Sequence, residues 1–170
     1  TENAGAGMDS VQASVDYTLA TNVENLILTG AGAIAGNGNA VGNFISGNTG
    51  ANTLDGAGGV DTLVGGAGND LYILDVRGDV VLEASGGGSD TIQTAVSRTL
   101  DANIENLVLV GSATVGNGNA LDNVITGNSL ANTLNGGAGA DTLLGGSGND
   151  TLHGDVGNDV FVFDTALNGS

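Results

Sequence analysis

Apolar residues recur along this chain at intervals of nine. They include Leu54, Leu63 and Tyr72 in the first half and Leu143 and Leu152 in the second. Each lies in the middle of a short segment of apolar residues and threonine, and stretches rich in glycine, asparagine and aspartate separate these segments. No stretch has the period of an amphipathic helix. Each nonapeptide therefore predicts a tight turn followed by a short strand, with the central apolar side chain pointing inward.

Two such nonapeptides make one coil with two strands. We therefore predict an all-β fold, a parallel β-roll or β-helix solenoid with eighteen residues in each coil. The longer apolar segments around Ile27 and Val108 are predicted to be further strands, with a helical turn near Asn22 and Asn103. The predicted core consists of the central apolar residues Ile45, Leu54, Leu63, Tyr72, Ile125, Leu134, Leu143, Leu152 and Phe161.

The chain contains an internal duplication. Residues 9–34 correspond to residues 90–115 at an offset of 81, so that NVENL at 22–26 matches NIENL at 103–107. After the loss of one residue, 36–70 correspond to 116–150 at an offset of 80. The nine-residue register resumes almost at once between the copies. We therefore expect a single continuous solenoid over 1–170, with copies at 2–82 and 83–164.

The clearest candidate chemistry lies in three consecutive units at 136–162, which are GGAGADTLL, GGSGNDTLH and GDVGNDVFV. Each has glycine at its first and fourth places and aspartate at its sixth. Glycine-rich turns can direct several carbonyl oxygens at one point, and Ca²⁺ takes about six to eight oxygen ligands. Sixth-place aspartates two units apart are expected to stack about 4.8 Å apart. Their charges repel at that separation unless a cation lies between them.

The predicted metal ligands are therefore the sixth-place carboxylates together with carbonyls of the turn glycines. The carboxylates are Asp61, Asp70, Asp79, Asp90, Asp141, Asp150 and Asp159. The carbonyls belong to Gly56, Gly58, Gly65, Gly66, Gly68, Gly136, Gly137, Gly139, Gly145, Gly146, Gly148, Gly154 and Gly157. The other aspartates, such as Asp55 and Asp122, are expected to be solvated surface charges, with Asp155 an additional candidate ligand in its turn.

Steps of eighteen residues predict which carboxylates pair. Asp61 pairs with Asp79 and Asp141 with Asp159. Two extra residues, Glu83-Ala84, interrupt the nine-residue register, and we call this interruption the two-residue slip. Asp70 pairs with Asp90 if the slip is looped out. Asp150 falls between Asn132 and Asn168, which predicts a mixed or weak site.

Asparagine replaces aspartate at four sixth places, Asn43, Asn52, Asn123 and Asn132. Asparagine carries no charge, and stacked amides can hydrogen-bond to one another without a metal. Each copy is thus predicted to begin with metal-free coils and to continue with calcium-loaded coils. We expect about three to six Ca²⁺ ions in all.

The pattern at 136–162 resembles the calcium-binding nonapeptide of the RTX, or hemolysin-type, family. The resemblance implies a parallel β-roll with calcium between successive turns, in a secreted bacterial protein that uses type I secretion and folds outside the cell. It implies an extracellular location, the type I secretion machinery as a partner, and a structural or secretion role beside another domain that carries the activity. The four sixth-place asparagines depart from the family's pattern.

Composition narrows the function further. Nineteen acidic residues against two arginines give a net charge of −17, which disfavours nucleic acid and anionic membrane surfaces and favours cations. No apolar run approaches the roughly twenty residues of a membrane span. The chain has no cysteine and no lysine, and the one histidine, His153, falls at an outward ninth place. We expect no catalytic site and no cofactor other than Ca²⁺.

The main alternative is a carbohydrate-binding or adhesin segment of an extracellular enzyme or surface protein. The acidic composition disfavours a polyanionic glycan but leaves a neutral glycan open as a partner. Ice binding through an array of threonine and asparagine is a third hypothesis. The third and fifth places of the turns vary, as at Ala138 and Ser147, and offer no regular array.

Overall fold

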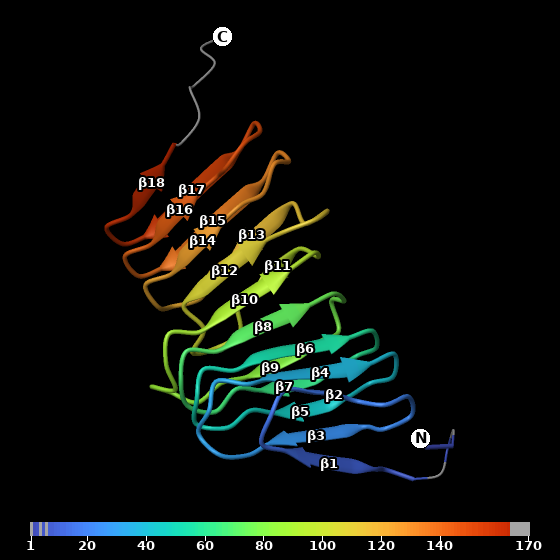
Figure 1. The fold of residues 1–170 in the computed structure, drawn as a ribbon. Helices are drawn as coiled ribbons and strands as arrows, with labels where there is room; N and C mark the ends of the chain where they lie inside the picture. The colour runs from blue at the N-terminus through green and yellow to red at the C-terminus, as the bar shows by residue number, and fades with distance from the viewer. Residues whose placement is uncertain (1, 4, 6, 164–170) are drawn as a thin grey trace. The chain divides into compact units, whose positions relative to one another are not determined.

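The structure is a computed structural model that describes residues 2, 3, 5 and 7–163. The described residues form strands and turns but no helix, and the fold is the predicted all-β parallel solenoid (Figure 1). The chain divides into two compact units, Thr1–Thr91 and Ile92–Ser170. The expected end of the second copy, at residue 164, lies outside the described residues.

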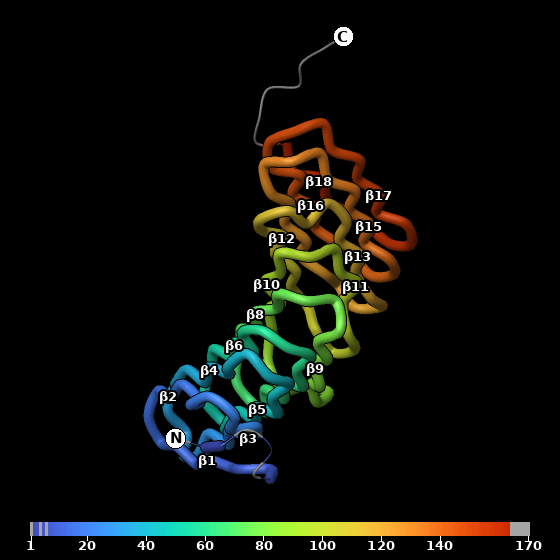
Figure 2. The backbone as a smooth tube through the Cα atoms, turned by 90° about the vertical axis from the view of Figure 1, so that its right-hand side faces the viewer, coloured from blue at the N-terminus to red at the C-terminus, as the bar shows by residue number. Residues whose placement is uncertain are grey.

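The first unit winds between two parallel sheets. Strands β1, β3, β5, β7 and β9 follow one another in one sheet and β2, β4, β6 and β8 in the other, so each coil contributes one strand to each sheet (Figure 2). Ile45 pairs with Leu63 and Leu54 with Tyr72, so a coil has the predicted eighteen residues. The strands are β1 (Ser10–Ala13), β2 (Tyr17–Thr18), β3 (Asn25–Leu28), β4 (Ala35–Asn39), β5 (Phe44–Ser46), β6 (Thr53–Ala57), β7 (Thr62–Val64), β8 (Leu71–Leu74) and β9 (Val80–Leu82).

The second unit has the same construction. Strands β12, β14, β16 and β18 pair in parallel in one sheet, and β11, β13, β15 and β17 do so in the other. The strands are β10 (Thr91–Thr94), which begins at the boundary, β11 (Arg98–Thr99), β12 (Asn106–Leu109), β13 (Val115–Asn117), β14 (Val124–Thr126), β15 (Thr133–Ala138), β16 (Thr142–Leu144), β17 (Thr151–Val156) and β18 (Val160–Val162). Ile125, Leu143 and Phe161 occupy equivalent positions in three successive coils.

The central apolar residues of the strands form the core of each unit. Seven of the nine predicted core residues have no solvent exposure, namely Ile45, Leu54, Leu63, Tyr72, Ile125, Leu134 and Leu143. Leu152 is half-buried, and Phe161 is 42% exposed, so the prediction of a buried Phe161 is wrong. The physical reason is its position, because β18 is the end strand of its sheet and no described coil covers its outer side.

The predicted helical turn near Asn22 and Asn103 is also wrong. Both asparagines have φ of 64°, which is the left-handed region that no right-handed helix uses. In the first unit, the Val23 N–H donates to the Ala20 carbonyl oxygen at 3.2 Å and closes a tight turn. Asparagine tolerates this conformation better than most residues, so its recurrence in both copies indicates a turn.

Candidate metal sites in the turns

Each sixth-place residue directly precedes a strand, so strand pairing aligns these residues along an edge of the coils. Asp61, Asp70, Asp79 and Asp90 precede β7, β8, β9 and β10, and Asp141, Asp150 and Asp159 precede β16, β17 and β18. Because the strands pair in parallel register, the residue before one strand lies beside the residue before its neighbour. We call each such row of sixth-place residues a ladder.

Hydrogen bonds connect the steps of each ladder. The Oδ1 atom of a sixth-place aspartate accepts the backbone N–H of the sixth-place residue in the preceding coil. Asp61 N–H donates to Asp79 and Asp141 N–H to Asp159, both at 3.1 Å, and Asp70 N–H donates to Asp90 at 2.8 Å. These are the three carboxylate pairs that the spacing predicted. Asp150 accepts the N–H of Asn132 at 2.8 Å, and its other predicted neighbour, Asn168, lies outside the described residues.

The second carboxylate oxygen of the central steps has no hydrogen-bond donor. Asp61, Asp70 and Asp141 are 1%, 2% and 0% exposed, and the Oδ2 atom of each is buried without a hydrogen-bond partner. A buried anionic oxygen without a donor is strongly unfavourable in a folded protein. These atoms are therefore the sharpest indication that the turns accept a further ligand with positive charge.

The same burial raises the pKa of these carboxyls. Burial, followed by the neighbouring Asp79 carboxylate, raises the pKa of Asp61 to about 6, although the Asn43 N–H works in the opposite direction. Burial also raises the pKa of Asp70, with Glu83 adding to the effect, and it raises the pKa of Asp141, with Asp159 adding to it. In each case the protein disfavours the charged form that a divalent cation would stabilise.

First-place glycines leave room for the buried oxygens. A Cβ atom on Gly56 would lie 2.2 Å from Asp61 Oδ2, and one on Gly136 would lie 2.3 Å from Asp141 Oδ2. The same contact recurs at Gly65, Gly145 and Gly154. Glycine at the first place is thus required because the sixth-place carboxylate folds back over it.

Turn carbonyls supply further oxygens between the coils. A Cβ on second-place Gly66 would lie 2.5 Å from the Asn48 carbonyl oxygen, and one on fourth-place Gly139 would lie 2.5 Å from that of Leu121. Equivalent carbonyls of the preceding coil face the other predicted second- and fourth-place glycines, Gly68, Gly137, Gly146, Gly148 and Gly157. Third-place Gly58 differs, since the nearest such atom is the Ala40 Cα at 3.8 Å. The gap between turns therefore contains carboxylate and carbonyl oxygens, the donor set that suits a hard cation such as Ca²⁺.

In the asparagine units, an uncharged amide occupies the sixth place and connects neighbouring coils by hydrogen bonds. Asn123 Oδ1 accepts the Asn119 N–H at 2.8 Å, and its Nδ2 donates to the carbonyls of Ile104 and Glu105 in the preceding coil. Second-place Asn119 also donates to two carbonyls, those of Asp101 and Ile104. The pairs Asn39/Asn43, Asn48/Asn52 and Asn128/Asn132 bond in a similar manner, with one carbonyl acceptor each for Asn52 and Asn132.

This arrangement corrects one detail of the sequence prediction. The sixth-place asparagines do not stack on one another, because each ladder step above Asn43, Asn52, Asn123 and Asn132 is an aspartate. Each asparagine instead joins an aspartate-bearing coil to the irregular coil before it. An amide is suited to that position because it donates to backbone carbonyls, which a carboxylate cannot do.

The remaining predicted ligands lie near the end of the described chain. Asp150 and Asp159 are half-buried, whereas Asp61, Asp70, Asp79, Asp90 and Asp141 are at most 4% exposed. Asp155 is exposed and has φ of 63° at the second place of its turn. His153 is exposed, as its ninth place predicted.

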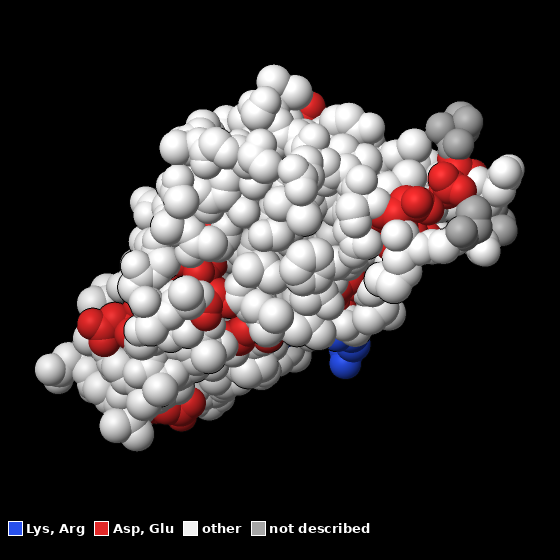
Figure 3. Space-filling model, turned by 90° about the horizontal axis from the view of Figure 1, so that it is seen from below, with Lys and Arg blue, Asp and Glu red and all other residues white. Residues whose placement is uncertain are grey.

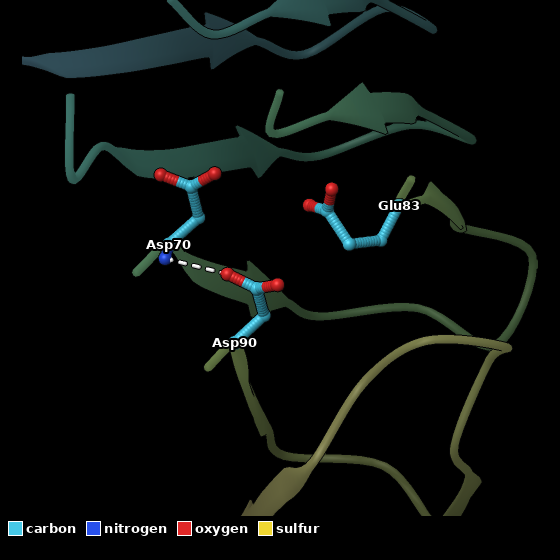
Figure 4. Close-up of side chains that lie close together, drawn as sticks. All are labelled: Asp70, Glu83 and Asp90. Carbon is cyan, nitrogen blue, oxygen red and sulfur yellow. Dashed lines mark hydrogen bonds between the residues drawn. The ribbon is translucent and has the colours of Figure 1, made fainter. Parts of the chain in front are cut away.

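Some acidic residues at the ladders were not predicted as site residues, among them Glu24 and Glu83. Glu24 directly precedes β3 and its Oε2 accepts the Asp9 N–H at 2.9 Å, so it takes the role of a sixth-place aspartate. Its position before an apolar strand was a usable signal. Glu83 follows β9 inside the two-residue slip, and its carboxylate lies within 4.8 Å of those of Asp70 and Asp90 (Figure 4). Only the folding of the slip reveals that proximity.

Burial of the ladder acids also reduces the acidic charge at the surface. The face in Figure 3 is mostly uncharged, with acidic side chains in separate patches, although the chain has a net charge of −17. No part of the described chain forms an apolar helix of membrane-crossing length.

Comparisons with known proteins agree with this geometry. Residues 37–72 and 126–161 match the family described as the RTX calcium-binding nonapeptide repeat, with four copies. A relative, endo-1,3-1,4-beta-glycanase ExsH of Rhizobium meliloti (strain 1021), is 54% identical over 43 residues, which are 25% of this chain and 9% of that protein. The match thus covers less than a tenth of that relative. No solved structure matches the chain.

Proposed function

We propose that this chain, which carries RTX calcium-binding nonapeptide repeats, is a calcium-driven folding module of a secreted protein. The module binds several Ca²⁺ ions between the turns of its coils, folds in response, and supports another domain of its parent protein. The ligands are the sixth-place carboxylates and the turn carbonyls named above.

The observation that carries this proposal is the set of buried Oδ2 atoms at Asp61, Asp70 and Asp141, none of which has a hydrogen-bond donor. Two carboxylates about 4.8 Å apart repel by roughly 1 kcal/mol in water and by several times that at a lower effective dielectric. A divalent cation removes this repulsion and satisfies the buried oxygens. Because the ladders align only when the strands pair, the cation binds the folded form and stabilises it by mass action.

The composition supports the other part of the proposal, that the chain is unfolded without calcium. Without a cation, 19 acidic residues and 32 glycines oppose compaction, through charge repulsion and backbone entropy. We infer that the chain stays largely unfolded where calcium is scarce, as in the cytosol, and folds where calcium is abundant. This matches export through type I secretion machinery and an extracellular location.

We also infer that the module has no catalytic role. Its paired carboxylates are explained by the stacking of coils. The name of the relative concerns that protein's own activity, and the matched 43 residues make up 9% of it. A carbohydrate-binding or adhesin role remains the alternative proposal, and a glycan array is expected to show no binding.

Calcium titration tests the proposed function. Far-ultraviolet circular dichroism of the chain in excess chelator should show mostly disordered structure, and millimolar calcium should produce a β spectrum. Isothermal titration calorimetry should count several calcium ions per chain. A spectrum that is already β-rich in chelator and unchanged by calcium, with no binding heat, would contradict the proposal.

A further inference from the structure

Among the described ladder steps that join two aspartates, one step in the first unit has a different spacing. Sixth-place residues in successive coils are normally eighteen positions apart, as for Asp61 and Asp79, but Asp70 and Asp90 are twenty apart. The two additional residues follow β9, where the Gly87 N–H donates to the Ala84 carbonyl oxygen and closes a turn. This turn leaves Glu83 next to the ladder, a position that other aspartate-bearing coils fill with an uncharged residue, such as Gly65 or Gly145.

Glu83 brings a third carboxylate to this step. One carboxylate oxygen each from Asp70, Glu83 and Asp90 lies within 4.8 Å of the other two. Figure 4 shows the Glu83 carboxylate extending from the end of β9 toward Asp70, with Asp90 in the next coil. The three residues thus lie at three separate strand ends, and all three belong to the first compact unit.

Independent geometry shows that oxygens of Asp70 and Glu83 border one space. A Cβ atom on Gly65 would lie 2.1 Å from the Tyr72 hydroxyl, 2.4 Å from Asp70 Oδ2 and 2.6 Å from Glu83 Oε2. Asp70 is 2% exposed, and its Oδ2 atom has no hydrogen-bond partner. A buried oxygen without a donor is therefore directed into the space that the Glu83 carboxylate also borders.

Tyr72 holds Glu83 in place. Its hydroxyl donates to Glu83 Oε2 at 2.5 Å, and its ring is fully buried in the core. A tyrosine hydroxyl is protonated at neutral pH, so it can donate this hydrogen bond. The second oxygen of the Glu83 carboxylate accepts the Ala84 N–H at 2.7 Å. The glutamate is thus oriented before any ligand arrives, which lowers the entropy cost of binding.

We propose that Asp70, Glu83 and Asp90 form a three-carboxylate site for a divalent cation, and that it binds Ca²⁺ more tightly than the two-carboxylate steps at Asp61/Asp79 and Asp141/Asp159. This inference rests on the proposed calcium-binding function and adds a ranking of the sites. Calcium affinity in proteins rises with the number of charged ligands and with the rigidity of the site. Both increase here, through Glu83 and through its hydrogen bond to Tyr72.

Terbium luminescence tests this ranking, because Tb³⁺ is a hard, oxygen-seeking substitute for Ca²⁺ that emits when a nearby tyrosine transfers energy to it. The chain has two tyrosines and no tryptophan. When Tb³⁺ is added to the full chain after calcium removal, emission on tyrosine excitation should rise in the first part of the titration. Tyr72→Phe should abolish most of it, and Tyr17→Phe should preserve it. Added Ca²⁺ should compete the signal away.

The decisive variant is Glu83→Gln, which keeps the side chain's size and removes its charge. We expect it to weaken Tb³⁺ and Ca²⁺ binding at the emitting site at least tenfold. Asp75→Asn is the matched control, since Asp75 is an exposed acid of the same unit outside the ladders, and it should change the affinity less than threefold. Circular dichroism in saturating calcium should show that both variants fold.

The outcomes of these experiments distinguish the three-carboxylate site from the broader proposal of calcium-driven folding. If the chain binds several calcium ions but Glu83→Gln and Asp75→Asn have equal effects, the three-carboxylate site is wrong while calcium-driven folding stands. Emission that survives Tyr72→Phe and disappears in Tyr17→Phe would also overturn it. If calorimetry detects no calcium binding, the proposed function itself fails. If Glu83→Gln does not fold even in saturating calcium, the unmodified chain tests the proposal instead. Calcium is then titrated against bound Tb³⁺, and the emitting site should be the last to exchange.

Discussion

At the residue scale, the first and fourth places of a turn require glycine for different physical reasons. The first-place glycine leaves room for the sixth-place carboxylate, which folds back over it. The fourth-place glycine adopts φ angles that other residues rarely reach, such as 124° at Gly139. The sequence predicted that these glycines form turns that direct carbonyls. It did not predict that they allow adjacent turns to approach so closely, because that property belongs to two coils and not to one.

Two neighbouring glycines in the first unit allow a matched test. Gly59→Ala should destabilise the calcium-loaded chain by about 2 kcal/mol or more, because φ is 121° there and the new Cβ would lie 2.6 Å from the Val41 carbonyl oxygen. Gly58→Ala should be neutral or slightly stabilising, since its new Cβ would have ordinary contacts only. Urea unfolding in millimolar calcium measures both, and equal midpoints for the two variants would contradict the close stacking of turns.

The charge at the sixth place can be tested without changing its shape. Asp141→Asn can still accept the Asn123 N–H, so it removes mainly the charge, and we expect calcium affinity at that step to fall at least tenfold, or about 1.4 kcal/mol. Asp122→Asn is the control, because Asp122 is an exposed acid that accepts the Ala140 N–H and lies outside the ladders. Calorimetry that found the same loss for both would show that the sixth place has no special role.

At the element scale, a coil with a sixth-place asparagine directly precedes the aspartate steps at Asp61, Asp70, Asp141 and Asp150. The sequence distinguished the two kinds of coil by their sixth-place residue, and the hydrogen bonds explain the difference. The paired asparagines, such as Asn119 and Asn123, bind the preceding coil through their amides, whereas the aspartate coils leave buried oxygens without donors. The asparagine coils are therefore the part of each unit best able to form before calcium binds.

Removing one of these amides should weaken the chain independently of calcium. Asn123→Ala eliminates bonds to the carbonyls of Ile104 and Glu105 and leaves the Asn119 N–H without its acceptor. We expect a loss of roughly 2–4 kcal/mol in the urea unfolding of the calcium-loaded chain, with unchanged calcium stoichiometry. Asn149→Ala, at an exposed fifth place, should cost less than about 0.5 kcal/mol. A drop in the number of bound calcium ions in Asn123→Ala would show that this coil binds metal after all.

The period of nine was enough to predict the strands of the regular coils, the eighteen-residue coil and the carboxylate pairs Asp61/Asp79 and Asp141/Asp159, because regular stacking converts sequence spacing directly into spatial proximity. Prediction failed where regularity ends. Phe161 is exposed because it lies on an end strand, Asn22 occupies an irregular turn, and Glu83 reaches the ladder only through the two-residue slip. In each case the outcome depends on a neighbouring coil that the local pattern does not specify.

For the molecule as a whole, the buried acids connect calcium, pH and folding. Asp61 has a pKa raised to about 6 from its ordinary 3.8, so its charged form is disfavoured in the fold. The corresponding stability is complete below the unfolded-state pKa and is lost as pH rises through 6, on the order of 3 kcal/mol for this residue alone. Raised pKa values at Asp70 and Asp141 add in the same direction.

The chelated chain should therefore gain β structure when the pH is lowered from 7 to about 4.5, because protonation removes the buried charges. The calcium-loaded chain should respond in the opposite direction, because acid competes with calcium for the same carboxylates. Circular dichroism and urea unfolding across this range, with chelator and with millimolar calcium, should give two stability curves that converge at low pH. Asp61→Asn should flatten both curves. If acidification destabilised the chelated chain, the ladder carboxylates would not be the groups that oppose its folding, and calcium would have to stabilise the coils by some other means.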